Sequence, residues 1–277
     1  MSLVDVIAPA VATPPAARTA PLVSLRGVDK VFGNGVTALT GVDLDIREGE
    51  FLSLLGPSGC GKSTVLRMLS GLCKPTRGSL AWAGATPQLG FVFQEPTLTP
   101  WSTVFGNVWL PLRLKGVSKT AAKPRVEEAL ERVGLAGFAN AYPRELSGGM
   151  KMRVSIARAL VTRPSVLLMD EPFAALDEIT RTKLNDDLVA LKCDLGATVV
   201  FVTHSVYESV YLSTRIVLMA ARPGRAVAEI SVDAPLPRNE EFRLSQAYAE
   251  KCRETSLALC AAMDMPSAAA NREKVRS

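Results

Sequence analysis

The chain has 277 residues and a mass of 29.6 kDa, enough to bury a sizeable hydrophobic core. Hydrophobic residues (48%) and charged residues (21%) occur in the balance typical of globular proteins, which excludes whole-chain disorder and a fibrous repeat. The net charge of +5 is mild and does not call for a nucleic-acid partner, and no run of about 18 apolar residues is present to span a bilayer. The five cysteines lack metal-ligand spacing and indicate a reducing compartment.

The two ends of the chain differ in character from its middle. Residues 1–21 are rich in Ala, Pro, Val and Thr, and the prolines and the late first basic residue, Arg18, argue against a signal peptide. We therefore expect a disordered leader over 1–21. Residues 22–232 carry the patterns of an ordered domain, and residues 233–277 are predicted to form a C-terminal helix and a tail.

Several short segments read as strands of an α/β fold. Val42, Leu44 and Ile46 alternate with charged residues, which is typical of a half-buried strand. Continuous apolar runs predict strands of a parallel sheet that is covered on both faces, at 51–55, 89–93, 166–169 and 198–202. The first of these runs is followed by a glycine-rich loop and by helical spacing after Lys62, which is half of a βαβ unit.

A helical stretch interrupts this α/β pattern at about 97–162. Helical spacing at 126–133 predicts a helix with Pro124 in its first turn, and a second helix is predicted from Met150 to Val161. Farther along, 216–220 and 227–232 flank a Pro223–Gly224 pair, which predicts a hairpin closed by a type II turn.

The strongest motif is a complete match to G-x-x-x-x-G-K-[ST]. Its glycines let backbone N–H groups surround phosphate oxygens, and the following helix directs its positive dipole end at the same anion. Lys62 is expected to reach the β- and γ-phosphates, and Ser63 to bind Mg²⁺. The predicted nucleotide-binding residues of this loop are Gly56, Pro57, Ser58, Gly59, Cys60, Gly61, Lys62, Ser63 and Thr64.

Two carboxylates and the single histidine follow predicted strands. Asp170 and Glu171 stand at the carboxyl end of the 166–169 run, where ligands gather on a parallel sheet. We predict that Asp170 holds Mg²⁺ and that Glu171 is the general base for the attacking water. His204 and Gln94 follow two other strands, and His204 is predicted to contact the γ-phosphate; a structural histidine is the alternative.

Residues Leu146 to Met150 open the second predicted helix of the 97–162 stretch. Ser147, Gly148 and Gly149 fit a helix N-cap with a flexible hinge, and they equally fit a second anion-binding helix start. The chain thus has two helix starts that can bind phosphate but one predicted nucleotide. Both helix starts would have an anion to bind if two copies of the chain faced each other.

Together these residues resemble the ATP-binding cassette (ABC) ATPases. The resemblance covers about 22–232 and also rests on the segment Ala174 to Asp177. It implies a P-loop NTPase (RecA-like) core with a mainly parallel sheet, an antiparallel β part near the N-terminus and a helical insert subdomain. Met150 departs from the glutamine usual in the signature, and Ala174 from a common serine.

The resemblance also implies residue roles. Phe32 would stack on adenine, Gln94 would sense Mg²⁺ and the γ-phosphate, and His204 would clamp that phosphate beside Glu171. Ser147, Gly148 and Gly149 would bind the ATP held by the opposing subunit, and Asp177 would lie in the loop that crosses the interface.

The segments around 93–101, 171–181 and 220–225 are similar to those of nitrate/sulfonate/taurine-type importer ATPases. This implies a homodimer that binds ATP and Mg²⁺ on the cytoplasmic face of a bacterial inner membrane. Its partners would be an integral-membrane permease, contacted near Trp101 and Trp109, and indirectly a periplasmic solute-binding protein. The alternative is an ABC-type ATPase that acts on nucleic acid or ribosomes, although the insert of about seventy residues is too short for the long coiled coils of the DNA-repair class.

Overall fold

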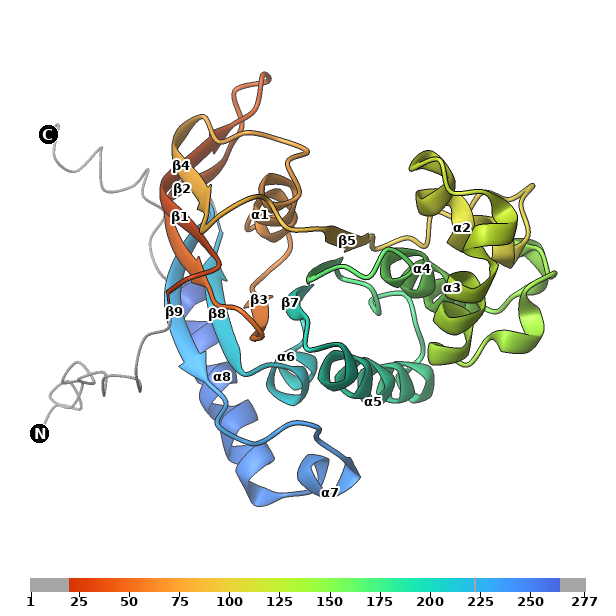
Figure 1. The fold of residues 1–277 in the computed structure, drawn as a ribbon. Coiled ribbons are helices and arrows are strands. Elements are labelled where there is room, and N and C mark those ends of the chain that lie inside the picture. Colours follow the sequence, from red (N-terminus) through yellow and green to blue (C-terminus); the bar gives the residue numbers. More distant parts are fainter. Residues whose placement is uncertain (1–19, 222, 265–277) are drawn as a thin grey trace, which may run out of the picture.

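A computed structural model describes residues 20–221 and 223–264 (Figure 1). The predicted leader over 1–21 lies outside the described residues except for its last two, and the predicted tail after Asp264 lies outside them as well. Within the described part of the chain, none of the helices combines the length and hydrophobicity needed to span a bilayer.

A six-stranded sheet forms the centre of the fold, in the order β5-β6-β7-β3-β8-β9. The first five strands are parallel and β9 pairs antiparallel with β8. The strands are β3 (Phe51–Leu55), β5 (Leu89–Val92), β6 (Val166–Asp170), β7 (Thr198–Thr203), β8 (Arg215–Ala220) and β9 (Arg225–Ser231). Every residue of β3, of β7 and of the predicted run 166–169 is buried, so the prediction of strands covered on both faces is confirmed for these three. It is wrong for β5, which lies at the edge of the sheet and has only its alternate residues buried.

A three-stranded antiparallel sheet covers one side of this core, in the order β2-β1-β4. Its strands are β1 (Val23–Val31), β2 (Thr37–Ile46) and β4 (Arg77–Trp82), and the helix α1 (Lys62–Leu69) shares one buried cluster with both sheets. The alternation along β2 is as predicted, because Val42, Leu44 and Ile46 are buried while Asp43 is exposed.

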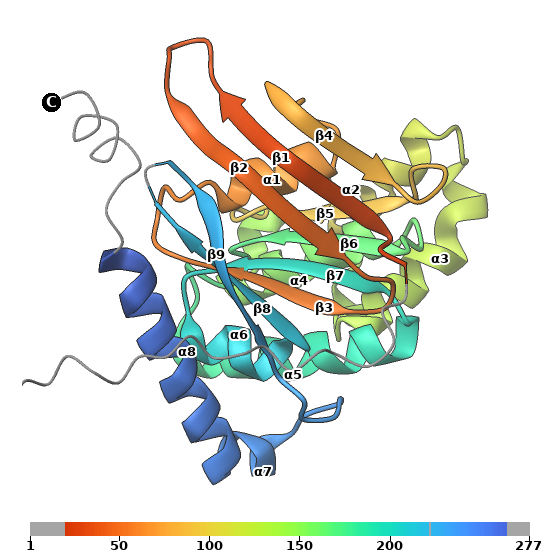
Figure 2. The same ribbon diagram turned by 90° about the vertical axis from the view of Figure 1, so that its left-hand side faces the viewer.

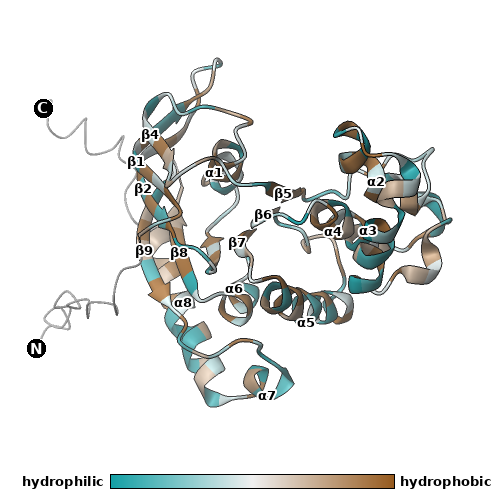
Figure 3. Ribbon diagram, viewed as in Figure 1, coloured by the Kyte–Doolittle hydropathy of each residue, from teal (hydrophilic) through white to brown (hydrophobic). Residues whose placement is uncertain are grey.

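Helices cover the opposite face of the six-stranded sheet. They are α5 (Glu178–Leu195), α6 (Val206–Leu212) and α8 (Gln246–Asp264), as Figure 2 shows. The helix α5 is amphipathic, and both hydrophobic and hydrophilic residues are visible on it in Figure 3. Leu184, Leu188 and Leu191 face the core, while other positions face solvent.

Three helices between β5 and β6 occupy the stretch where a helical insert is predicted. They are α2 (Val104–Leu114), α3 (Lys119–Arg132) and α4 (Gly148–Leu160), joined by short 3₁₀ helices at Ala136–Phe138 and Pro143–Glu145. In Figure 1, α2 and α3 stand beside the sheets, on the side of β5 away from the three-stranded sheet.

Two predicted helix starts lie too far along the chain, that of α3 by several residues and that of α4 by two. The helix α3 begins at Lys119 because the Ser118 hydroxyl accepts a hydrogen bond from the Ala121 N–H, so Pro124 lies inside the helix and not in its first turn. The helix α4 begins at Gly148, before the predicted Met150, because the hydroxyl of Ser147 accepts from the Met150 N–H (3.3 Å).

The hairpin β8–β9 is confirmed, but its predicted type II turn is wrong. That turn needs a positive φ at Gly224, and Gly224 does not have one. Glycine is required there for a different reason: a Cβ would collide with the carbonyl oxygen of Cys60 and lie 2.7 Å from that of Ala38. Gly224 exchanges backbone hydrogen bonds with Ala38 and Thr40, which ties the hairpin to β2.

One buried arginine joins the end of α6 to the segment that leads from β9 to the C-terminal helices α7 (Glu240–Arg243) and α8. Arg238 is 5% exposed, and burial lowers its pKa to about 10. Its guanidinium donates to five backbone carbonyl oxygens at 2.7–3.2 Å, namely those of Val210, Tyr211, Ser213, Val232 and Ala234. These contacts join the end of α6 to the segment after β9.

The replacement Arg238→Met is expected to lower the free energy of unfolding by about 3 kcal/mol, because it removes charge-assisted hydrogen bonds from five carbonyls. Urea unfolding measures the change. The control is Lys123→Met, which breaks an exposed ion pair on α3 and should change the free energy by less than about 0.5 kcal/mol. Equal effects of the two variants would contradict the role given to Arg238.

Candidate active site

The loop from β3 to α1 is shaped by its glycines. Gly59 and Gly61 have φ values of 79° and 90°, which side chains other than hydrogen disfavour, and a Cβ on Gly56 would collide with the Met219 carbonyl oxygen. The loop borders a cavity of about 520 Å³. Six of the nine predicted loop residues line it, namely Ser58, Gly59, Gly61, Lys62, Ser63 and Thr64.

The other three predicted loop residues do not line this cavity. Gly56 and Cys60 are buried, and Pro57 is half-buried. The Cys60 N–H donates to the Pro57 carbonyl oxygen (3.3 Å), and burial raises the pKa of its thiol. Cys60 therefore supports the loop from beneath.

The ammonium group of Lys62 is held inside the loop. Its side chain is 3% exposed, and Nζ donates to the carbonyl oxygens of Gly56 (2.7 Å) and Pro57 (3.0 Å). The Oε1 atom of Glu171 lies 3.6 Å from Nζ. A buried cation that borders a cavity and is only partly compensated by one carboxylate attracts a further anion such as a phosphate.

Two oxygen ligands meet beside Lys62. The Ser63 hydroxyl donates to Oδ1 of Asp170 (2.8 Å), which stands at the end of β6. Burial raises the pKa of Asp170, and the hydrogen bond from Ser63 opposes that shift. A hydroxyl and a carboxylate are hard donors that fit Mg²⁺, and Gln94, with a third side-chain oxygen, lines the same cavity.

Glu171 and His204 are adjacent because β6 and β7 are adjacent strands. Nδ1 of His204 lies 3.0 Å from Oε2 of Glu171, so this carboxylate contacts both Lys62 and His204. Glu171 has a φ of 44°, a conformation that costs a non-glycine residue about 1–3 kcal/mol. The N–H of Glu171 donates to the Val202 carbonyl oxygen of β7, which holds this strained backbone in place.

Sequence reasoning missed the far wall of the cavity. Val36, Thr37, Ala38 and Gly224 line it, and only the Pro–Gly pair before β9 marked one of them. Phe32, predicted to stack on adenine, is 37% exposed in the β1–β2 loop, is not among the lining residues, and lies with its ring centroid 5.3 Å from Nζ of Lys30.

The remaining predicted residues lie elsewhere. Ser147, Gly148, Gly149 and Asp177 do not line the cavity, but they are close to one another, since a Cβ on Gly149 would lie 2.6 Å from Cγ2 of Thr180. Asp177 caps α5 by accepting from the Thr180 N–H (3.0 Å), a hydrogen bond that lowers the pKa of Asp177. The structure thus brings Leu146 to Met150, the signature segment, close to the loop before α5. Neither segment lines the cavity beside the phosphate loop of the same chain.

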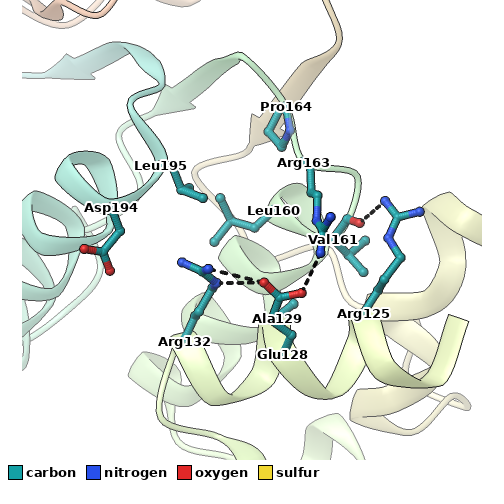
Figure 4. Close-up of a pocket in the computed structure, with 10 residues that line it drawn as sticks. All are labelled: Arg125, Glu128, Ala129, Arg132, Leu160, Val161, Arg163, Pro164, Asp194 and Leu195. Atoms are coloured by element: carbon teal, nitrogen blue, oxygen red, sulfur yellow. Dashed lines mark hydrogen bonds and ion pairs between the residues drawn. The ribbon is translucent and has the colours of Figure 1, made fainter.

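A second cavity, of about 320 Å³, lies where α3, α4 and α5 end (Figure 4). Its charged residues are engaged with one another: Arg132 and Arg163 both bond Glu128, which lowers the pKa of Glu128, and Arg125 donates to the Val161 carbonyl oxygen. Because these groups bridge α3 to the end of α4, we interpret them as structural.

Comparisons with known proteins show the family of this chain. The ABC transporter family model matches residues 39–174. The aliphatic sulfonates import ATP-binding protein SsuB of Bacillus licheniformis is 44% identical over 236 residues, which cover 82% of this chain and 91% of that protein. The chain belongs to the ABC transporter family. As a member, it is an ATP-binding ATPase subunit of a transporter, and its similarity to importer ATPases is confirmed.

Solved structures of the ABC family show the same fold. The dimeric structure of MJ0796, a bacterial ABC transporter cassette, matches 77% of this chain and 100% of its own with a TM-score of 0.69 and 36% identity. The same cassette in a dimeric post-hydrolysis state, bound to ADP and Pi, has a TM-score of 0.68. The predicted P-loop NTPase fold is confirmed.

The replacement Lys62→Ala is expected to weaken ATP binding about tenfold or more and to reduce turnover to near background, because a charge-assisted contact to phosphate is worth about 1.5–3 kcal/mol. Fluorescence titration and phosphate release measure the two effects. Ser58→Ala is the control, because it keeps Lys62 and every backbone N–H of the loop. Its ATP affinity and turnover should stay close to those of wild type. Wild-type affinity and turnover in Lys62→Ala would contradict the assignment of the loop.

Proposed function

We propose that this chain is the motor subunit of a bacterial importer that holds Mg-ATP between the phosphate loop and the ends of β6 and β7. The observation that carries this is the continuous contact from Lys62 through Glu171 to His204 at one edge of the parallel sheet. Ser63, Asp170 and Gln94 would hold Mg²⁺, which neutralises phosphate charge when bound.

The side chains at this edge suit phosphoryl transfer to water. Glu171 accepts a proton from water as the water oxygen bonds to the γ-phosphorus, and the bond from that phosphorus to ADP breaks. His204 would fix the orientation of the Glu171 carboxylate through the 3.0 Å contact and would also contact the γ-phosphate. Lys62 balances the negative charge that passes to the leaving phosphate oxygen.

Two copies would complete each other's sites. Ser147 and Gly148 are exposed at the start of α4, where N–H groups are available to an anion, and Asp177 is exposed nearby. They do not line the cavity of their own chain, so a γ-phosphate from a second copy is the anion that suits them. The dimeric MJ0796 cassettes support this arrangement. Phe32 would supply an aromatic contact to adenine when nucleotide binds.

The transport partners follow from the relatives. An integral-membrane permease and, indirectly, a periplasmic solute-binding protein would complete the importer on the inner face of the membrane. The solute would be a small nitrate-like, sulfonate-like or taurine-like compound, and the name of the SsuB relative, an aliphatic sulfonates import ATP-binding protein, supports the sulfonate class. Of the two predicted contact residues, Trp101 is 79% exposed and available to a permease. Trp109 packs on the core and donates Nε1–H to the Val117 carbonyl oxygen, so its role is structural.

The replacement Glu171→Gln removes the general base but keeps the size of the side chain, so it should trap an ATP-bound dimer. Light scattering with saturating Mg-ATP is expected to show twice the mass of the nucleotide-free chain. Wild type, which hydrolyses ATP, and Glu171→Gln with Ser147→Arg, which blocks the shared site, should both remain largely monomeric. A monomeric Glu171→Gln chain at saturating ATP would count against the two-copy site.

The membrane partner can be identified directly. A tagged Glu171→Gln chain is expressed in its own host, membranes are solubilised with Mg-ATP, and bound proteins are identified by mass spectrometry. We expect a multi-span permease, and its loss when Trp101→Glu is added to the bait. Recovery with nucleic acid or ribosomes would favour the alternative class of ABC ATPase.

A further inference from the structure

One arginine connects two parts of the site that the sequence treats separately. Arg181, in the first turns of α5, donates Nη2–H to the Leu176 carbonyl oxygen (2.9 Å). Leu176 belongs to the loop 174–177 that ends at Asp177, which we call the interface loop. The Nε atom of the same guanidinium lies 3.6 Å from Oε1 of Glu208 on α6.

Glu208 in turn holds the segment 203–205, the histidine turn, on both sides of His204. Its Oε2 accepts from the Thr203 hydroxyl (2.5 Å), and that hydroxyl accepts from the Ser205 N–H (3.0 Å). The Glu208 N–H donates to the Ser205 hydroxyl (3.3 Å). The position of Glu208 therefore determines how His204 is presented to Glu171.

The carboxylate of Glu208 depends on Arg181 electrostatically. Its side chain is 8% exposed and burial raises its pKa, while the positive charge of Arg181 opposes that shift. A buried carboxylate without its cation is costly, so displacement of Arg181 changes the balance of the histidine turn. Arginine suits this position because its planar fork can contact a carbonyl on one side and a carboxylate on another.

Arg181 also has freedom to respond to the interface loop. Its Nε is buried and makes no hydrogen bond among the described residues, so the 3.6 Å ion pair can shorten into one. A cavity of about 330 Å³, lined by Arg181, Asn185, Glu208 and Arg243 among others, lies beside the guanidinium.

We propose that Arg181 is a positioning residue that couples the interface loop to the histidine turn. When a second copy docks against Asp177, the Leu176 carbonyl determines the position of the Arg181 guanidinium, which in turn determines the position of the Glu208 carboxylate. Glu208 then positions His204 against Glu171. The inference rests on the proposed dimeric ATPase and adds to it the path by which docking of the partner aligns the histidine of the same chain.

The experiment is a double-mutant cycle on ATP hydrolysis with Arg181→Gln, Glu208→Gln and the double variant. Each single replacement should lower kcat about tenfold and change the half-saturating ATP concentration by less than about twofold, because neither side chain lines the nucleotide cavity. The double variant should be no slower than the slower single variant, since both break the same connection. Arg181→Lys, which keeps the charge without the fork, replaces Arg181→Gln in the cycle if that variant does not fold.

The matched control is Arg243→Gln. Arg243 lines the same cavity and ion-pairs with Asp186 of α5 (2.7 Å), but it contacts neither the interface loop nor Glu208 through any hydrogen bond or ion pair found among the described residues. Its kcat should stay within about twofold of wild type.

Three results would overturn the inference. The first is a double variant whose decrease in kcat is the product of the two single decreases. The second is an equal decrease in kcat in Arg243→Gln. The third is an unchanged kcat with a change only in the half-saturating ATP concentration. The proposed function fails in a distinguishable way, because wild type itself would then hydrolyse no ATP and Glu171→Gln would not dimerise.

Discussion

The buried ammonium of Lys62 is the interaction on which the rest of the site depends. Carbonyl oxygens of the phosphate loop hold Nζ from one side and Glu171 lies on the other, so the loop, α1 and the end of β6 are joined through one charge. The loop can adopt this shape only because glycines stand where side chains would collide or where φ is positive. Gly224 of the β8–β9 hairpin packs closely against the Cys60 backbone of the loop and also lines the cavity, so the hairpin forms part of the cavity wall.

The order of the strands places further candidate catalytic side chains beside this loop. The neighbouring strands β6 and β7 end at the same edge, where Asp170 is the last residue of β6 and where Glu171 and His204 directly follow β6 and β7. Glu171 occupies an unfavourable backbone conformation that the adjacent strand holds through a hydrogen bond to Val202. Strain of this kind is common where a side chain must point in one direction for chemistry, and here it turns the carboxylate toward both Lys62 and His204.

The chain carries two anion-seeking helix starts that do not meet. The start of α1 borders the cavity, whereas the start of α4 lies beside the interface loop. This separation fits the proposed site shared between two copies, in which Arg181 would connect the shared surface to His204. In this proposal, ordinary hydrogen bonds and ion pairs would link ATP hydrolysis to the association of the two copies.

Much of the chemistry could be predicted from the sequence because its signals are local. The phosphate loop, the strand-end pair Asp170–Glu171 and the alternation of β2 each lie within a few consecutive residues, and each was found where predicted. The start of α3 was misplaced because its capping serine, Ser118, gives a weaker signal than Pro124, whereas Ser147 was recognised as a possible N-cap of α4. No local sequence pattern encodes contacts between segments that are far apart in the chain. Such contacts make glycine necessary at position 224, form the cavity wall at Val36 to Ala38, and connect the two ends of the path through Arg181. The sequence by itself indicated which groups are candidates for phosphate and Mg²⁺ binding, because each motif lies within a few consecutive residues. Only the tertiary structure decided which groups support them, because packing brings distant backbone and side chains within contact distance.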